Sequence, residues 1–224
     1  MDSETVLRLK RRIREVEAVS ALDTLGLKPE QCRFLNLPFY ETGKVRKDPI
    51  GDRDVEIILD LLEEQRPEII LVAGDLSDPH GTHRMCKDAI DLALERYTVE
   101  APEAWLYRGA WEEWSIAEAD ILVPMSEEEL RLKISAILKH QSQKDRAPFP
   151  GVDEREFWQR VEERNKGTAR LVDRLGLPEY YAMEALVVRH GAGHLAEGAG
   201  APQAVDWSHQ ALPLHRRVDP SLLE

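Results

Sequence analysis

The residues of this sequence best suited to chemistry are two histidines, His80 and His83, in the segment VAGDLSDPHGTHRMC at residues 72–86. Asp75 and Asp78 stand just before them. A hydrolytic zinc site needs about three protein ligands, an open position for water, a base and an acid. One histidine could bind a metal and the other donate a proton, while an aspartate orients an imidazole ring. The alternative is a polar loop with two exposed histidines at a helix start.

A strand and a helix are expected to hold this loop. The run at 68–74 is short and continuously apolar, which predicts a strand buried on both faces in a parallel sheet. The pattern at 82–97 predicts the helix that follows. Ligands of open α/β sheets bind outside the carboxyl ends of the strands, which is where this loop begins.

The rest of the sequence alternates helices with apolar strands, and this predicts a doubly wound α/β sheet. Ser126 with Glu129 forms a capping-box pattern at one helix start. Residues 1–190 are expected to form one domain, and the tail at 191–224, rich in Gly, Ala and Pro, is expected to be disordered. The further predicted helices are 5–25, 52–66, 127–140 and 153–175, and the further predicted strands are 32–38, 104–111, 120–125 and 182–190.

Composition narrows the class of protein. The formal net charge of −12 argues against nucleic acid as the main partner, because binding phosphates needs clustered Lys and Arg. The basic cluster at 10–14 is a local exception, expected to be a solvated helix face. No apolar run approaches the roughly 18–20 residues of a membrane span, and the charged N-terminus lacks a secretory signal, so we expect a cytoplasmic protein. Cys32 and Cys86 are predicted to be reduced, which leaves His and carboxylate ligands for zinc.

Six segments together resemble the LmbE-like, or PIG-L-like, zinc N-deacetylases. The similarity is greatest to the LmbE-like half at the C-terminus of some bacterial glucosamine-6-phosphate deaminase chains. The resemblance implies a Rossmann-like, mostly parallel sheet with helices on both faces. It also implies a divalent metal, usually zinc, and hydrolysis of an acetamide on an amino sugar. The segments lie within about residues 5–190, at 9–18, 34–43, 72–86, 105–114, 139–145 and 156–169.

The resemblance implies roles for the residues of the histidine loop. His83 matches the zinc ligand, and His80 matches the histidine that stabilises or protonates the reacting group. Asp78 is a further catalytic candidate or ligand. Thr82 stands where many members of the family have aspartate, so the orientation of the histidine pair departs from the common pattern.

Two short patterns outside the loop also match the family. Arg14 and Glu17 resemble its RxxE element near the substrate, where a guanidinium could anchor an anionic or polyol group. An ordinary helix-surface ion pair is the alternative. His140 and Gln143 lie in an HxSQ pattern that the resemblance implies is near the site. A buried histidine with satisfied hydrogen bonds is the alternative there.

The segment WLYRGAWEEW at 105–114 combines aromatic residues with Arg108. Aromatic faces pack against the apolar face of a sugar, and Arg108 could hold a phosphate. Trp111 is the second candidate for ligand binding, whereas Trp105 is expected in the core. A strand and loop filled with core aromatics is the alternative.

The family's HPDD motif has no counterpart here, since no histidine precedes His80. The resemblance implies that this motif supplies a histidine ligand, an aspartate ligand, the base and the first strand. We therefore expect very weak or absent deacetylation by this chain alone. We also expect the chain to be marginally stable, to self-associate, or to pair with a complementing N-terminal polypeptide. A non-catalytic binding or assembly remnant and an accessory domain of a glucosamine-6-phosphate deaminase are the alternatives.

Overall fold

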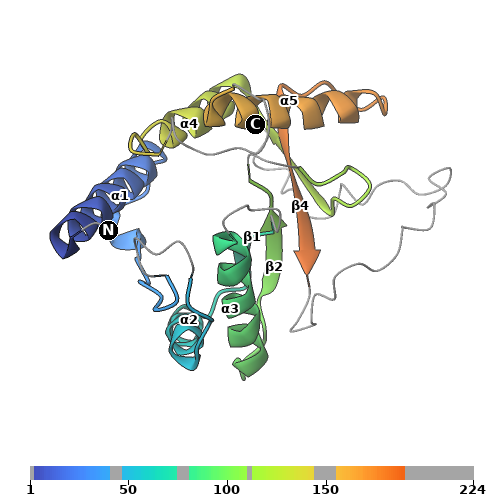
Figure 1. Ribbon diagram of the computed structural model, residues 1–224. Helices are drawn as coiled ribbons and strands as arrows, with labels where there is room; N and C mark the ends of the chain where they lie inside the picture. Colours follow the sequence, from blue (N-terminus) through green and yellow to red (C-terminus); the bar gives the residue numbers. More distant parts are fainter. Residues whose placement is uncertain (1–2, 41–46, 75–80, 110–112, 144–154, 190–224) are drawn as a thin grey trace. The chain divides into compact units, whose positions relative to one another are not determined.

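A computed structural model of the 224-residue chain divides it into two units, Met1–Gly193 and His194–Glu224. All residues that the structure describes lie in the first unit (Figure 1). The expected tail at 191–224 therefore lies outside the described residues and stays a prediction. The described ranges are 3–40, 47–74, 81–109, 113–143 and 155–189.

Four strands form one sheet in the order β1-β2-β4-β3. β1 and β2 run parallel, whereas β4 is antiparallel to both β2 and β3. The α/β class with helices on both faces is confirmed. β1, β2 and β3 share one direction, as a mostly parallel sheet requires, and β4 alone runs against them, so the described sheet is mixed and not purely parallel. An apolar run reports burial and not direction, so the sequence pattern could not separate the two arrangements. The bounds are β1 Ile69–Ala73, β2 Glu103–Tyr107, β3 Ile121–Met125 and β4 Ala182–Arg189.

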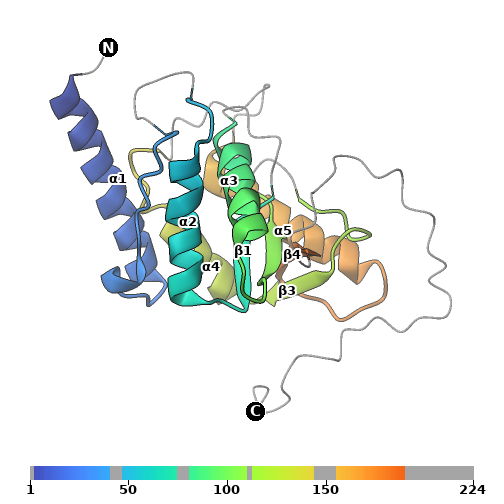
Figure 2. The ribbon, with the colours of Figure 1, turned by 90° about the horizontal axis from the view of Figure 1, so that it is seen from below.

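Helices cover both faces of this sheet. α3 packs on β1 and α2 packs on α3, while α5 packs on β4 and α4 joins α5 to α1. Figures 1 and 2 show α2 and α3 on one side of the sheet and α4 and α5 on the other. The bounds are α1 Glu4–Thr24, α2 Asp52–Gln65, α3 Thr82–Arg96, α4 Glu127–Ile137 and α5 Phe157–Asp173, with a short 3-10 helix η1 at Pro29–Gln31.

The helices begin and end where local chemistry predicts. Ser126 Oγ accepts a bond from the backbone nitrogen of Glu129 at 3.2 Å, and Glu129 Oε2 accepts one from the Ser126 nitrogen at 2.7 Å, so the capping box of α4 is confirmed. Gly26 follows α1 with φ +80°, a left-handed conformation that ends a helix at little cost for glycine.

Each side of the sheet has its own core. Six buried side chains of α2 and α3 pack together with Tyr97, which directly follows α3, and Ile70 of β1 packs against them. On the other side, Ala169 and Val172 of α5 pack on Met183 of β4. These clusters join the sheet to a layer of helices on each side.

Two strand predictions are wrong in instructive ways. Residues 32–38 form no strand; Leu35 and Leu37 instead pack against the α2–α3 core. β1 is not buried on both faces, since the Leu71 side chain is 64% exposed while Val72 is buried. β1 lies at the sheet edge, and α3 covers one of its faces.

Among the described residues, no helix has the length and apolar character that crossing a membrane requires.

Candidate functional site

Two sequence patterns 125 residues apart meet at Glu17. Its Oε1 accepts a bond from the Ser142 backbone nitrogen, and its Oε2 accepts one from Ser142 Oγ, both at 2.7 Å. Gln143 also donates to this carboxylate, and His140 lies close enough to act on it electrostatically. We call Glu17, His140, Ser142 and Gln143 the Glu17 cluster. The structure thus brings three of the predicted site residues together, where α1 packs on the end of α4.

The environment keeps Glu17 ionised. Partial burial alone would raise the pKa of Glu17, but the hydrogen bonds from Ser142, the nearby His140 and Gln143 together lower it. The Glu17 carboxylate has room for about one further hydrogen bond, because an ionised carboxylate offers about four lone-pair sites and three of them accept from Ser142 and Gln143. Glu17 is therefore a strong acceptor at neutral pH.

Arg14 lies one helical turn before Glu17 and faces a third matched segment. Its Nη1 lies 3.5 Å from Tyr40 Oη. Tyr40 is held in place through its neighbour Phe39, whose backbone nitrogen donates to Asp54 Oδ1 at 2.9 Å. Asp54 is 2% exposed and also accepts from the Gly51 nitrogen at 2.8 Å, so it anchors both ends of this loop. The predicted Arg14–Glu17 ion pair is not the contact that holds Arg14.

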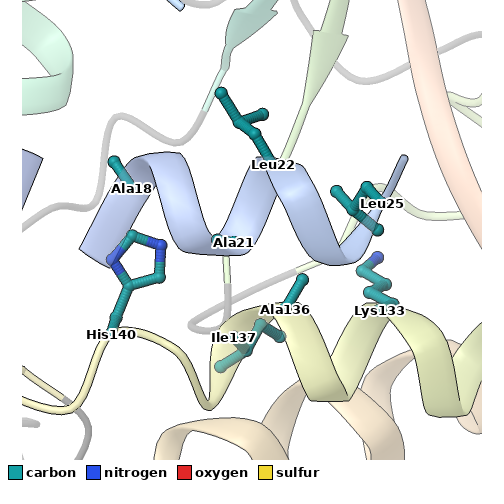
Figure 3. Close-up of a pocket in the computed structure, with 8 residues that line it drawn as sticks. All are labelled: Ala18, Ala21, Leu22, Leu25, Lys133, Ala136, Ile137 and His140. Carbon is teal, nitrogen blue, oxygen red and sulfur yellow. The ribbon is translucent and has the colours of Figure 1, made fainter. Parts of the chain in front are cut away.

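A cavity of about 430 Å³ lies between α1 and α4 beside the Glu17 cluster. Figure 3 shows the His140 ring at one end, beside Ala18, and Lys133 near Leu25 at the other. The remaining lining is aliphatic, from Ala21, Leu22, Ala136 and Ile137. His140 is half-buried and lines this cavity, so it is not the fully buried histidine of the alternative interpretation.

A second polar cluster lies at the carboxyl end of β2 and is built around Arg164 of α5. Arg164 is 9% exposed, and its Nη2 donates to Glu184 Oε1 at 2.9 Å. Its Nε lies 3.4 Å from Glu113 Oε2, and its Nη1 donates to the carbonyl oxygens of Arg108 and Gly109. Lys133 Nζ lies 2.5 Å from Glu184 Oε2. We call Glu113, Lys133, Arg164 and Glu184 the Arg164 cluster.

Burial governs the ionisation of this second cluster. It raises the pKa of Glu113, and the attraction of Arg164 offsets only part of that effect. It lowers the pKa of Lys133, which Glu184 partly restores. Tyr107 at the end of β2 has a raised pKa, from burial first and then from Glu184 and Cys86.

Arg108 stacks on Trp114, with the guanidinium carbon 4.1 Å from the ring centroid. Trp114 Nε1 donates to the Leu106 carbonyl oxygen at 2.9 Å, which fixes the ring against β2. The predicted phosphate-binding role of Arg108 stays a prediction. Gly74 follows β1 here, and a Cβ at this position would lie 2.9 Å from Leu106 Cβ and 3.0 Å from Trp114 Cζ2.

His83 lies in the first turn of α3, at the carboxyl end of β1. Asp78, His80 and Trp111 lie outside the described residues, as does Asp75. Within the described ranges, no three His, Cys, Asp or Glu side chains gather as metal ligands. The described residues therefore do not by themselves fit the zinc that the resemblance implies, and no step through a metal follows from them.

Six residues in or beside these clusters were not among the candidates chosen from the sequence. Two of them, Lys133 and Glu184, lie outside the segments that carry the family resemblance. The other four are Tyr40, Glu113, Ser142 and Arg164. Each lies in a segment that carries the family resemblance, namely 34–43, 105–114, 139–145 and 156–169 respectively. Membership of a matched segment is therefore the sequence signal that could have identified these four residues. Their roles depend on contacts between distant segments, which no local pattern reveals.

The chain is similar in sequence to a glucosamine-6-phosphate deaminase-like protein of Bacteroides thetaiotaomicron. The two are 52% identical over 193 residues, a match that covers 84% of this chain and 29% of that protein. The chain thus spans less than a third of the length of the relative that it matches. No protein-family model matches it.

Solved structures show the fold. A deacetylase of the teicoplanin biosynthesis pathway, in its complex with bog, has a TM-score of 0.52 and 15% identity, covering 84% of this chain and 75% of that one. The zinc-inhibited form of teicoplanin deacetylase Orf2 has a TM-score of 0.48 and 17% identity, covering 84% and 76%. The first likeness shows that the chain shares the fold of that deacetylase. The chain is a relative of one part of a glucosamine-6-phosphate deaminase-like protein, which confirms the resemblance seen in the sequence.

Proposed function

We propose that this chain is a deacetylase-type domain of amino-sugar metabolism that binds an amino sugar or sugar phosphate at the Glu17 cluster. The meeting of Glu17 with Ser142, Gln143 and His140 carries the proposal. It gathers an anionic acceptor, an amide and an imidazole near the surface, with the Arg14 guanidinium one turn away. Sugar hydroxyl groups both donate and accept hydrogen bonds, so a mixed set of this kind suits a polyol.

The reaction proposed for the complete domain is hydrolysis of an N-acetyl group. Water adds to the acetamide carbonyl, the C–N bond breaks, and acetate and a free amine leave. In this proposal His83 is a zinc ligand, His80 is the acid, and Asp78 assists them, with Arg108 and Trp111 on the substrate side. The family resemblance supports these roles, as it supports zinc as the metal. A cytoplasmic location completes the proposal.

A second candidate function is that of a non-catalytic or accessory domain within a deaminase-like polypeptide. The 52% identity to a protein of that name favours it, because the matched part is only 29% of the protein's length. Ligand binding and acetate release separate the two candidates. A domain with the proposed activity binds N-acetylated sugars and releases acetate when completed, whereas an accessory domain binds a sugar phosphate without releasing acetate.

The first experiment measures binding to the chain by calorimetry, with N-acetylglucosamine, its 6-phosphate and glucosamine 6-phosphate as probes. Glu17→Gln is expected to lower the affinity for the tightest-binding probe by about tenfold or more, since a hydrogen bond to a charged group contributes about 1.5–3 kcal/mol. Glu15→Gln is the matched control, because Glu15 lies on the same helix and pairs with Arg12 at 3.7 Å. Equal binding by wild type and Glu17→Gln would contradict the assigned site.

The second measurement is acetate release with zinc added. The chain alone is expected to release acetate at or near the background rate. A rate well above background, retained in His83→Ala, would contradict the role proposed for His83.

A further inference from the structure

Two cations of the chain contact one tyrosine near the Glu17 cluster. Arg14 Nη1 lies 3.5 Å from Tyr40 Oη. Lys47 Nζ lies over the face of the Tyr40 ring, 4.0 Å from the ring centroid. Arg14 belongs to α1, whereas Tyr40 and Lys47 precede α2. The fold therefore gathers a guanidinium and an ammonium from two segments around a single phenol side chain.

Lys166 shows how a similar contact is completed elsewhere in the chain. Its Nζ lies 4.8 Å from the Tyr181 ring centroid and 2.8 Å from Glu162 Oε1, so a carboxylate balances its charge. Among the described residues, no carboxylate forms such an ion pair with Arg14 or Lys47, although Lys47 is half-buried.

The gathering of two like charges favours a bound anion. Acidic residues outnumber basic ones in this chain, 42 to 30, so a carboxylate is the ordinary partner of a basic side chain. Two cations on one aromatic ring repel each other, and an anion between them removes that repulsion. A phosphate group suits this place, because its oxygens accept charge-assisted hydrogen bonds from guanidinium and ammonium groups alike.

Both Tyr40 and Lys47 lie close in sequence to backbone that a buried carboxylate fixes. Asp54, which is 2% exposed, accepts from the Phe39 nitrogen at 2.9 Å and from the Gly51 nitrogen at 2.8 Å. Phe39 directly precedes the tyrosine, and Gly51 follows shortly after the lysine. Groups held in this way lose less freedom when a ligand binds, and such preorganisation favours affinity.

The two cations lie next to the proposed sugar site. Arg14 and Glu17 are three residues apart on α1, and side chains at that spacing are neighbours, with Cβ atoms about 5–6 Å apart. A hexose phosphate is longer than this separation, so one molecule can bind at both positions at once.

We infer that Arg14 and Lys47, aligned by Tyr40, bind the phosphate monoester of a phosphorylated amino sugar whose ring lies at the Glu17 cluster. The inference rests on the proposed function and deepens it, because it selects the sugar phosphate from the two ligand classes named there. Lys47 and Tyr40 thereby determine specificity, and neither belongs to the RxxE pattern found in the sequence.

The test compares glucosamine with glucosamine 6-phosphate, which differ in the phosphate alone, by calorimetry on the whole chain at low salt. The wild type is expected to bind the phosphorylated sugar about tenfold or more tightly, because hydrogen bonds to charged groups are the strong ones. Lys47→Gln is expected to lower this affinity ratio by about tenfold. Lys166→Gln is the matched control, since it removes the same charge from a lysine that also contacts a tyrosine, and it is expected to keep the ratio.

Three further measurements separate the phosphate contact from a loss of structure. Lys47→Arg keeps the charge and is expected to retain the preference for the phosphorylated sugar. Tyr40→Phe keeps the ring beneath Lys47 but removes the hydroxyl near Arg14, so it is expected to lower the ratio less than Lys47→Gln does. Inorganic phosphate, used alone as a probe, is expected to raise the midpoint of thermal unfolding of the wild type but not of Lys47→Gln. Circular dichroism confirms that each variant is folded.

The outcomes distinguish the phosphate subsite from the sugar site. Equal affinity for the two sugars would overturn the subsite and leave the Glu17 site in place. Lys47-dependent binding of inorganic phosphate without binding of either sugar would overturn the proposed function and retain an anion site. Absence of all binding would overturn both. A preference that is lost equally in Lys166→Gln, or lost in Arg108→Gln but retained in Lys47→Gln, would also overturn the assignment to Lys47.

Discussion

The Glu17 cluster and the Arg164 cluster are both polar and both join distant segments, but they differ in burial and therefore in what their polar groups bind. Glu17 accepts from Ser142 near the surface, and its pKa is lowered. Arg164 is 9% exposed and is surrounded by carboxylates and carbonyl oxygens, while the pKa of Glu113 beside it is raised. The first cluster has acceptor capacity left for a ligand. The second uses its capacity to fix the protein itself.

The contrast matters because a perturbed pKa marks both clusters. Shifted pKa values gather at functional sites, but structural ion pairs shift them too. Arg164 holds the carbonyl groups of Arg108 and Gly109, so it sets the path of the chain after β2. The comparison predicts that substitutions in the Arg164 cluster lower the free energy of unfolding. Substitutions in the Glu17 cluster are predicted chiefly to weaken ligand binding.

The largest expected effect comes from Arg164→Met. It leaves Glu113 and Glu184 partly buried without their shared cation, and breaking a buried pair in this way costs about 3–5 kcal/mol. Urea unfolding at neutral pH measures the change. Arg170→Met is the control on the same helix, because Arg170 pairs with Glu163 at the surface and is expected to cost under about 1 kcal/mol. Equal losses of unfolding free energy in Arg164→Met and Arg170→Met would contradict the distinction between the buried Arg164 cluster and a surface ion pair.

A smaller effect is expected from Ser126→Ala, which removes the N-terminal cap of α4. This helix carries Lys133 of the Arg164 cluster and precedes His140 of the Glu17 cluster. The loss of the bond to the Glu129 nitrogen is expected to lower the free energy of unfolding by about 1 kcal/mol. The control is Ser135→Ala on the same helix, where the exposed hydroxyl bonds to the Arg131 carbonyl oxygen, with an expected change within about 0.5 kcal/mol. A change in Ser135→Ala as large as that in Ser126→Ala would argue against the cap as the cause.

The smallest effect is in the pH dependence of stability, and its sign differs between the clusters. Glu17 has a lowered folded pKa, so its contribution is present above the ordinary glutamate pKa and is lost as pH falls through the folded value. Glu113 has a raised folded pKa, so its contribution is present below the ordinary value and is lost as pH rises through the folded one.

Unfolding free energies of wild type, Glu17→Gln and Glu113→Gln between about pH 3 and pH 7 test these signs. The advantage of wild type over Glu17→Gln is expected to shrink on acidification. The advantage of wild type over Glu113→Gln is expected to shrink as pH rises. Profiles that change in the same direction would remove the electrostatic difference between the clusters.

Local pattern predicted much of the fold. All five described α-helices were expected within a few residues, because apolar spacing, Gly26 and the Ser126–Glu129 box are signals carried by neighbouring residues. The direction of β4 and the edge position of β1 were not expected. Both are decided by how distant strands pair, and an apolar run is the same in either case.

The candidate site was predicted in part for the same reason. Glu17 and His140 were chosen from separate short patterns, but their meeting through Ser142 spans 125 residues and depends on α1 packing against α4. The segment at 32–38 shows the converse error. Its apolar residues predicted a short strand, but Leu35 and Leu37 pack against the α2–α3 core.

β4 is the last described strand in the chain and lies between β2 and β3 in the sheet. During synthesis, β1 and β2 can pair as soon as they emerge, but β3 has no strand to join until residues 182–189 are available. Long-range pairings of this kind form late and slow folding. A chain whose synthesis stops before β4 would therefore leave β3 unpaired with the β1–β2 pair. Synthesis of residues 182–189 is the step that allows the four-stranded sheet to form.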